Sequence, residues 1–335
     1  MVMILSLQPS PTRETSARLV YRKEKITLLR YAPDKPKIHP VPVFIVTPLI
    51  ARPYILDLSP DLSFVTYLTN EGFDVFMMDF GVAHASDRYL KFDNYIYDYM
   101  APAMDYALSL CGSPSASLLG YCLGGIFATL YTALIPEPVR NLVILAAPIN
   151  FSQGGPLYRW LQGLDVDRLV DSLGNIPPEF IRDNIRLFAS MMAPERNLRA
   201  VLDLLLHLWD WEYLRRQQRI HQWLQDLLPF PGEAYRQFIK ELVQANKLVR
   251  KELYLRGRLV NLSRITCPIL IMAHRADLLA PPESVKDLVN LVASEDKEFF
   301  EVAGGSVGHL DIVVGREGPR VTWPKISSWL KGRSR

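Results

Sequence analysis

The segment that most constrains the fold is Gly-Tyr-Cys-Leu-Gly-Gly, which occupies residues 120–125. The apolar run Ala116–Leu119 before it suits a buried parallel strand, and Ile126–Leu134 after it is a good helix former. The glycines on both sides of Cys122 permit a tight, strained turn that lifts this side chain out of the sheet. The pattern therefore predicts a strand, a sharp turn that presents a thiol, and a helix.

Cys122 stands where a turn of this kind usually presents a nucleophilic serine. At the start of a helix, the macrodipole favours the thiolate form of a cysteine, which is the reactive form. The alternative is a buried, inert cysteine in a Gly-rich turn. We interpret Cys122 as a nucleophile, and the sulfur atom directs our expectation from ester hydrolysis toward thioester chemistry.

Composition narrows the class of protein. With 335 residues, of which 49% are hydrophobic, the chain can form one large α/β domain or a domain with an insertion. Three cysteines without close pairing favour a reducing compartment, and their spacing with the histidines does not suggest a metal site. A net charge of +3 is too small to indicate nucleic-acid binding.

The N-terminal segment and the hydropathy pattern indicate a cytoplasmic protein. Met1–Leu7 is apolar, but it lacks the basic region and the cleavage site of a secretory signal. No apolar stretch approaches the roughly 18 residues that a membrane span requires, so we expect no membrane span.

Strand-like and helix-like segments alternate along much of the chain, which predicts a doubly wound, mostly parallel sheet. Between 150 and 265 the apolar residues fall at helical spacing, so we expect an α/β core at 1–149 and 266–335 with an inserted helical cap at 150–265. The expected strands lie at 17–31 (a hairpin), 42–47, 73–79, 116–119, 139–147, 268–272 and 297–302, and the expected helices of the core at 62–70, 92–110, 126–134 and 321–330.

An acid and a base are expected in loops that follow later strands of such a sheet. Asp277 follows the strand at 268–272, and Pro281 and Pro282 after it argue against further regular structure there. His309 follows the strand at 297–302 in a Gly-rich loop. We predict that His309 takes the proton of Cys122 and that Asp277 orients the imidazole or shares in activating a hydroxyl.

The other histidines compete poorly for the role of the base. Two of them precede the nucleophile, two fall within cap helices, and one lies only two residues past its strand; these are His39, His84, His207, His221 and His274.

An oxyanion hole requires two backbone donors. The N–H group of Leu123, directly after the nucleophile, is the first candidate, and Ile50, in the loop after the strand at 42–47, is the second.

At the level of motifs, the chain resembles the polyhydroxyalkanoate synthases, specifically the short catalytic subunit of the two-subunit classes III and IV. The resemblance rests on the cysteine box at 120–125, on the acid and base segments around Asp277 and His309, and on Pro-Phe-Pro-Gly-Glu-Ala-Tyr-Arg-Gln at 229–237. It extends over nearly the whole chain. It implies an α/β-hydrolase fold with Cys122, Asp277 and His309 as a catalytic triad.

The resemblance also implies a reaction and partners. Cys122 would attack the thioester of an (R)-3-hydroxyacyl-CoA, release CoA and carry the acyl group until the 3-hydroxyl of another unit takes it. The CoA thioester is the substrate, so no cofactor and no metal are expected. The expected partners are a small helical second subunit, a second copy of the chain, or both, and the surface of a polyester granule.

Two departures and three alternative interpretations accompany this resemblance. Phe80 replaces a usual tryptophan, and the loop 303–311 before and around His309 is longer than the family's Gly-His turn. An acyl-CoA thioesterase or a cysteine hydrolase of the dienelactone-hydrolase type would have the same fold. A granule-binding protein with a vestigial triad is a further reading, against which the intact order of Cys122, Asp277 and His309 argues.

Overall fold

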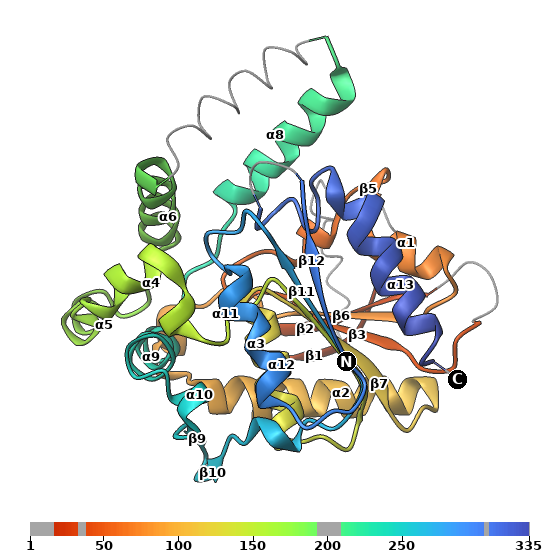
Figure 1. Ribbon diagram of the computed structural model, residues 1–335, viewed down its shortest axis with the longest axis horizontal. Helices are drawn as coiled ribbons and strands as arrows, with labels where there is room; N and C mark the ends of the chain where they lie inside the picture. Colours follow the sequence, from red (N-terminus) through yellow and green to blue (C-terminus); the bar gives the residue numbers. More distant parts are fainter. Residues whose placement is uncertain (1–16, 33–37, 193–208, 305–307, 335) are drawn as a thin grey trace, which may run out of the picture.

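A twisted, mostly parallel sheet forms the centre of the computed structural model, which describes residues 17–32, 38–192, 209–304 and 308–334 (Figure 1). Eight strands of the described chain pair in the order β1–β2–β6–β3–β7–β8–β11–β12. Within this sheet only β2 runs against both of its neighbours, and every other pair is parallel. The strands are β1 Arg18–Lys23, β2 Ile26–Tyr31, β3 Val43–Val46, β6 Val75–Asp79, β7 Ala116–Tyr121, β8 Val139–Leu145, β11 Ile269–His274 and β12 Lys297–Val302. This arrangement confirms the predicted fold class.

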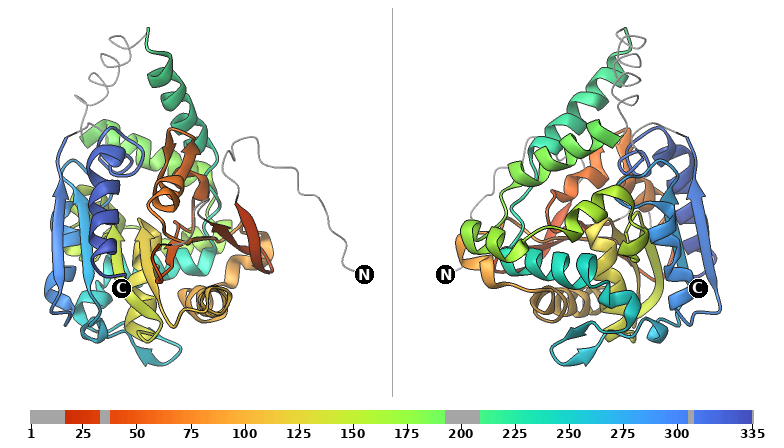
Figure 2. Two further views of the ribbon diagram at one scale, coloured as in Figure 1. Left: turned by 90° about the vertical axis from the view of Figure 1, so that its right-hand side faces the viewer. Right: turned by 60° about the vertical axis from the view of Figure 1, so that its left-hand side comes forward.

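Helices cover both faces of this sheet (Figures 1 and 2). The helices α1 (Phe64–Asn70) and α13 (Trp323–Lys331) pack together on one face. On the other face lie α2 (Ala101–Cys111), α3 (Leu123–Leu134), α11 (Pro282–Lys286) and α12 (Leu288–Leu291). Every residue of α3 is buried, so the helix that begins directly after Cys122 is fixed on all sides by the core.

Mostly helical structure connects β8 to β11. Among the described residues, its α-helices are α4 Gly155–Gln162, α5 Val166–Leu173, α6 Pro178–Met192, α8 Trp211–Gln225, α9 Gly232–Gln237 and α10 Lys247–Arg250, with a π-helical stretch at Phe238–Gln244. The ends of α6 and α8 project beyond the sheet (Figure 1). This is the region in which we predicted a cap, but the division of the chain at 150 and 265 stays a prediction.

Several local expectations were wrong. A two-stranded hairpin, β9 (Tyr254–Leu255) with β10 (Arg258–Leu259), lies in the segment that we expected to lack strands. Helix α11 starts at Pro282, although we expected the prolines to exclude regular structure, because proline is compatible with the first position of a helix.

Two further boundaries also differ. His274 is the last residue of β11 and does not follow the strand. The helix expected at 92–110 divides into a π-helical stretch at Asn94–Met100 and the α-helix α2.

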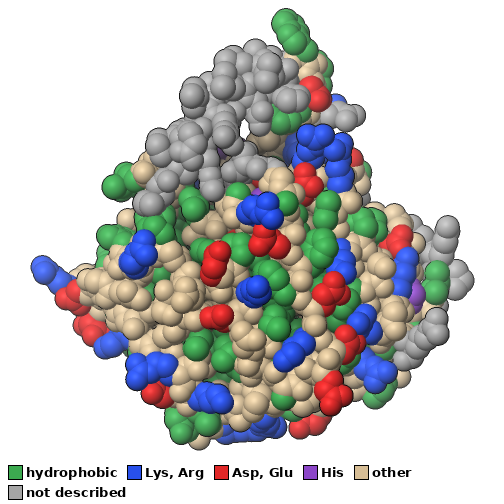
Figure 3. Space-filling view, in the orientation of Figure 1, with side chains coloured by type: hydrophobic (Ala, Val, Ile, Leu, Met, Phe, Trp, Pro, Cys, Tyr) green, Lys and Arg blue, Asp and Glu red, His purple; other side chains and the backbone are tan. Residues whose placement is uncertain are grey.

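Charged side chains of both signs are mixed on the surface of the protein. Lys and Arg side chains alternate with Asp and Glu side chains over the face shown in Figure 3. Within the described ranges, no helix combines the length and the apolar character that crossing a bilayer requires. The N-terminal segment Met1–Leu7, on which our expectation about targeting rests, lies outside the described residues.

Candidate active site

Cys122 sits at the apex of a strained turn between β7 and α3. Its backbone has φ 54° and ψ −128°, a conformation that residues other than glycine rarely adopt. The amide of Cys122 donates a hydrogen bond of 2.9 Å to the Leu145 carbonyl, and its own carbonyl accepts one of 2.9 Å from Gly125. A Cβ atom on Gly124 would lie 2.2 Å from the Val46 carbonyl oxygen, so only glycine lets the turn approach β3 this closely.

The structure brings Asp277 and His309 together beside this turn. The two residues follow β11 and β12, which are parallel neighbours, so their loops leave the sheet at the same edge. The Nδ1 atom of His309 lies 2.7 Å from Oδ2 of Asp277, and both side chains are buried. The other carboxylate oxygen of Asp277 accepts hydrogen bonds from the amides of Leu279 (2.8 Å) and Ala280 (2.9 Å). Three hydrogen bonds thus fix the carboxylate of Asp277, and one of them also orients the imidazole of His309.

His309 also hydrogen-bonds to the side chain of Cys122. Burial lowers the pKa of His309, but the charges of Asp277 and Cys122 and the hydrogen bonds to both more than compensate, so the pKa lies well above its usual range. The raised pKa favours the imidazolium form of His309, which lies beside Cys122 and can donate a proton. The arrangement can therefore supply a nucleophile and a proton donor from one pair of side chains.

An apolar cavity of about 140 Å³ lies against Cys122. The core contributes the turn itself and the start of α3, and helices α4, α6 and α9 close the other side. Its lining is Ile50, Cys122, Leu123, Ile126, Pro148, Leu157, Tyr158, Trp160, Leu161, Phe180, Ile181, Asn184, Ile185, Phe230, Tyr235, Phe238, Ile239 and Leu279. Such a lining suits a small apolar ligand and disfavours water.

Both residues that we predicted for the oxyanion hole border this cavity. Leu123 is the first residue of α3, and Ile50 lies in the loop after β3. The Ile50 carbonyl accepts a hydrogen bond of 2.8 Å from the amide of Leu228, which ties this loop to the chain after α8. Their role as donors stays a prediction.

Two tyrosines that we did not single out contact the loops of the acid and the base. The hydroxyl of Tyr121 donates to the His309 carbonyl, and the hydroxyl of Tyr158 donates to the Leu279 carbonyl. The position of Tyr121 inside the cysteine box was the one feature of the sequence that could have suggested a role for this residue at the site. No spacing in the sequence shows where its hydroxyl points.

The structure places the remaining described histidines in other settings. His39 hydrogen-bonds to the Glu71 carbonyl and stacks on Phe73, and His221 is an exposed side chain on helix α8. Nδ1 of His274 lies 3.1 Å from the amide of Ala276, and His84 begins a short 3₁₀ turn. His207 and the loop residues 305–307 lie outside the described residues.

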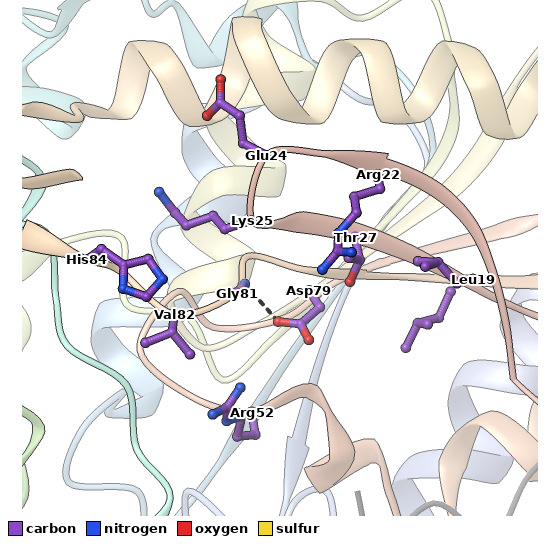
Figure 4. A pocket seen from close by; sticks show the side chains of 11 residues that line it. Leu19, Arg22, Glu24, Lys25, Thr27, Arg52, Asp79, Gly81, Val82 and His84 are labelled. Atoms are coloured by element: carbon purple, nitrogen blue, oxygen red, sulfur yellow. Dashed lines mark hydrogen bonds between the residues drawn. The ribbon is translucent and has the colours of Figure 1, made fainter. Parts of the chain in front are cut away.

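A second and larger cavity, of about 650 Å³, lies between the β1–β2 hairpin and the loop after β6 (Figure 4). Its charged side chains include Glu24, Lys25, Arg52 and Asp79. Lys25 pairs with Asp87 at 2.8 Å, the Tyr99 hydroxyl donates to Glu24 at 2.6 Å, and Arg52 pairs with Asp226 at 3.4 Å. Lys25 and Arg52 thus form ion pairs within the protein, and Glu24 accepts a hydrogen bond from a neutral hydroxyl. Within the part of the chain that the structure describes, no group of three or more His, Cys, Asp or Glu side chains could hold a metal ion.

The sheet order, the turn at Cys122 and the loops after β11 and β12 define a protein of the α/β-hydrolase fold. A family model described as "alpha/beta hydrolase fold" matches residues 56–313. Among solved structures, MenH from S. aureus is similar with a TM-score of 0.54 and 17% identity, over 92% of this chain and 99% of that one. A thermophilic esterase from Thermogutta terrifontis has a TM-score of 0.53 and 15% identity, over 95% of this chain and 97% of that one. At these identities the likeness shows the fold alone.

Closer relatives identify the family. The chain is 33% identical to the poly(3-hydroxyalkanoate) polymerase subunit PhaC of Allochromatium vinosum, over 98% of this chain and 92% of that protein. It is 38% identical to the protein of the same name from Haloferax mediterranei, over 96% of this chain and 65% of that protein. A family model described as the N-terminus of poly-beta-hydroxybutyrate polymerase (PhaC) matches residues 12–68. The chain belongs to the PhaC family of poly(3-hydroxyalkanoate) polymerase subunits, which confirms the resemblance drawn from its motifs.

Proposed function

We propose that this protein polymerises (R)-3-hydroxyacyl-CoA into a polyester and releases CoA, with Cys122 as the nucleophile. The observation that carries the proposal is the relation to the Allochromatium polymerase subunit, which extends over 92% of that protein. The relatives do not favour the alternative of a thioesterase or a cysteine hydrolase, because those that we compared are named as polymerases or polymerase subunits. The protein is an enzyme of the transferase class.

Acylation is the first half of the proposed reaction. The Cys122 thiolate attacks the thioester carbonyl, and the N–H groups of Leu123 and Ile50 stabilise the oxyanion. When the bond between the acyl carbon and the CoA sulfur breaks, the His309 imidazolium gives its proton to the departing CoA thiolate. The product is an acyl thioester on Cys122, similar in energy to the substrate, and a neutral imidazole.

Chain extension is the second half. His309 takes the proton of a 3-hydroxyl group, and the alkoxide attacks the thioester on Cys122, so that an ester bond forms as the bond to sulfur breaks. Cys122 leaves as a thiolate beside a protonated His309, which restores the starting ion pair. Asp277 holds the imidazole in the orientation that both proton transfers require. The thioester supplies the activation, so we propose that no cofactor takes part.

The apolar cavity supports transfer to a hydroxyl instead of hydrolysis. Water that reached the acylated Cys122 would release a free hydroxy acid and end the polymer. The helices of the cap region close the cavity with side chains such as Phe180 and Phe238, which offer water no hydrogen-bonding partner.

We further propose that the enzyme acts with a second subunit, a small helical protein, at the surface of polyester granules in the cytoplasm. The word "subunit" in the names of the relatives supports a multi-subunit enzyme. The exposed Trp209 and Trp211, near the projecting start of α8, provide apolar surface for such a contact.

The test is to incubate the purified chain with (R)-3-hydroxybutyryl-CoA, with and without a candidate second subunit, and to measure CoA release together with the identity of the product. We expect an insoluble polyester. Free hydroxy acid in both reactions would contradict polymerisation. Cys122→Ala should abolish CoA release, whereas Cys267→Ala, the same exchange at a cysteine outside the cavity, should preserve it.

A further inference from the structure

Two buried tyrosine hydroxyls end on the loops that carry the acid and the base. Tyr121, the last residue of β7, donates a hydrogen bond of 2.9 Å to the carbonyl of His309. Tyr158, on α4, donates one of 2.6 Å to the carbonyl of Leu279, two residues after Asp277. Tyr121 is 1% exposed and Tyr158 5% exposed, so neither hydroxyl exchanges its partner freely with bulk water.

Tyr121 holds His309 at two points. Besides the hydrogen bond to the backbone, its ring stacks on the imidazole with centroids 5.4 Å apart and planes 28° from parallel. The ring stack restricts the tilt of the imidazole, and the hydrogen bond restricts the position of its backbone. Since Asp277 binds Nδ1, contacts to the backbone, the ring face and the ring edge together leave the imidazole one orientation toward Cys122.

Tyr158 acts on Asp277 through a single peptide segment. The amide of Leu279 donates to a carboxylate oxygen of Asp277, and the carbonyl of Leu279 accepts from Tyr158. Tyr158 also lines the cavity at Cys122 and lies in the cap region, whereas Asp277 belongs to the sheet edge. The hydrogen bond is therefore a direct link between the cover of the cavity and the loop of the acid.

We propose that Tyr121 and Tyr158 are positioning residues, which hold the loops of His309 and Asp277 in place from the core and from the cap region, respectively. The proposal rests on the proposed roles of Cys122, His309 and Asp277. Its physical basis is that removal of either hydroxyl takes away the hydrogen-bond donor of a carbonyl, buried at His309 and partly buried at Leu279, so that the loop shifts to find another partner. A shift of the imidazole weakens its stabilisation of the Cys122 thiolate.

The test uses the reactivity of the thiol and requires no acyl-CoA. The rate of alkylation of Cys122 by iodoacetamide is measured against pH in the full chain, with mass spectrometry to separate Cys122 from Cys111 and Cys267. Tyr121→Phe and Tyr158→Phe should each slow alkylation at neutral pH about 10-fold and change the midpoint of the pH profile. Tyr131→Phe is the matched control, because the hydroxyl of Tyr131 is buried without a hydrogen-bond partner among the described residues.

A purely structural role predicts a different result. It would lower the melting temperature of both variants and leave the midpoint of the pH profile where it is, and that outcome overturns the proposal. A double-variant comparison adds a second criterion, which also applies if Tyr121→Phe fails to fold. In an Asp277→Asn background, Tyr158→Phe should slow alkylation less than about 2-fold, because its effect passes through Asp277; a full additional 10-fold loss would contradict the proposal.

Alkylation and polymerisation report on separate claims. If the tyrosine variants change the alkylation profile and the wild-type chain makes no polyester, the positioning role stands and the proposed polymerase activity fails. If the chain makes polyester and the profiles of both variants match that of the wild type, the polymerase stands and the positioning role fails.

Discussion

Gly308 lies so close to Ala276 that the loops of the base and the acid touch through their backbones. A Cβ atom on Gly308 would be 2.4 Å from the carbonyl oxygen of Ala276 and 2.6 Å from the amide nitrogen of Asp277. Gly308 also has φ 65°, which glycine adopts without strain. The distance between His309 and Asp277 thus depends on the absence of a side chain at the preceding position.

Gly308→Ala should therefore separate His309 from Asp277 and slow CoA release about 10- to 100-fold. Gly112→Ala is a matched control, since Gly112 has φ 62° but nothing within 4 Å of an added Cβ. It should cost about 1 kcal/mol of stability and preserve the rate. Steady-state kinetics and thermal unfolding of both variants check this, and equal rates for the two would count against the proposed roles of these loops.

The pKa of His309 should respond more to the loss of Asp277 than to the loss of Cys122. The carboxylate gives the larger attraction and also a hydrogen bond to Nδ1. NMR titration of histidine-labelled protein should show a larger downward shift of the His309 pKa in Asp277→Asn than in Cys122→Ala. A larger downward shift in Cys122→Ala would show that Cys122, and not Asp277, is mainly responsible for the raised pKa of His309.

The same shift predicts how stability depends on pH. Folding raises the His309 pKa, so its contribution to stability is fully present below the unfolded pKa of about 6.5 and is lost as the pH rises through the folded value. Chemical denaturation between pH 6 and pH 10 should show a decline in the free energy of unfolding that is shallower in Asp277→Asn. Identical slopes in the two proteins would contradict this linkage.

Glycine at position 122 should give a more stable protein than alanine. The backbone of Cys122 has φ 54° and ψ −128°, which costs about 1–3 kcal/mol in any residue with a Cβ. Glycine relieves this strain but loses about 0.5–1 kcal/mol to the greater freedom of the unfolded chain. The free energy of unfolding of Cys122→Gly should exceed that of Cys122→Ala by about 1 kcal/mol in urea denaturation. A clear advantage for Cys122→Ala would mean that the turn is not strained.

Enlarging the cavity at Cys122 should widen the range of acyl groups. Ile181 lines the cavity from α6, so Ile181→Ala should raise kcat/KM for a six-carbon substrate relative to the four-carbon one by about 10-fold. Leu187→Ala, on the same helix but at a side chain that is 59% exposed, should leave that ratio unchanged. Competition between the two CoA thioesters measures the ratio directly. An equal change of the kcat/KM ratio in both variants would indicate that the acyl group binds outside this cavity.

The central parts of the site were predictable because they depend on local rules. A strained turn and the close approach of Gly124 to β3 both require glycine near Cys122. These glycines are visible in the sequence. The order of Asp277 and His309 follows from the order of the strands, and parallel β11 and β12 place the two loops side by side.

Other features depend on contacts that the sequence does not record. The hydroxyl of Tyr121 reaches His309, 188 positions away, and that of Tyr158 reaches Leu279, 121 positions away. Hydrophobic periodicity indicates which face of a strand or a helix is buried, but not which carbonyl a hydroxyl meets. The hairpin β9–β10 has two residues in each strand, too few to produce an alternating pattern.

Trp160 gives the protein an intrinsic optical reporter of what occupies the space beside Cys122. Its side chain lines the cavity and is 49% exposed, so one part of the indole faces the proposed acyl site and another part faces solvent. Under the proposed function, an acyl group that enters should change the polarity around the indole, and its emission should shift with each acylation of Cys122. With Trp160 as the signal, stopped-flow fluorescence can follow acylation and chain extension as separate phases in an unlabelled enzyme.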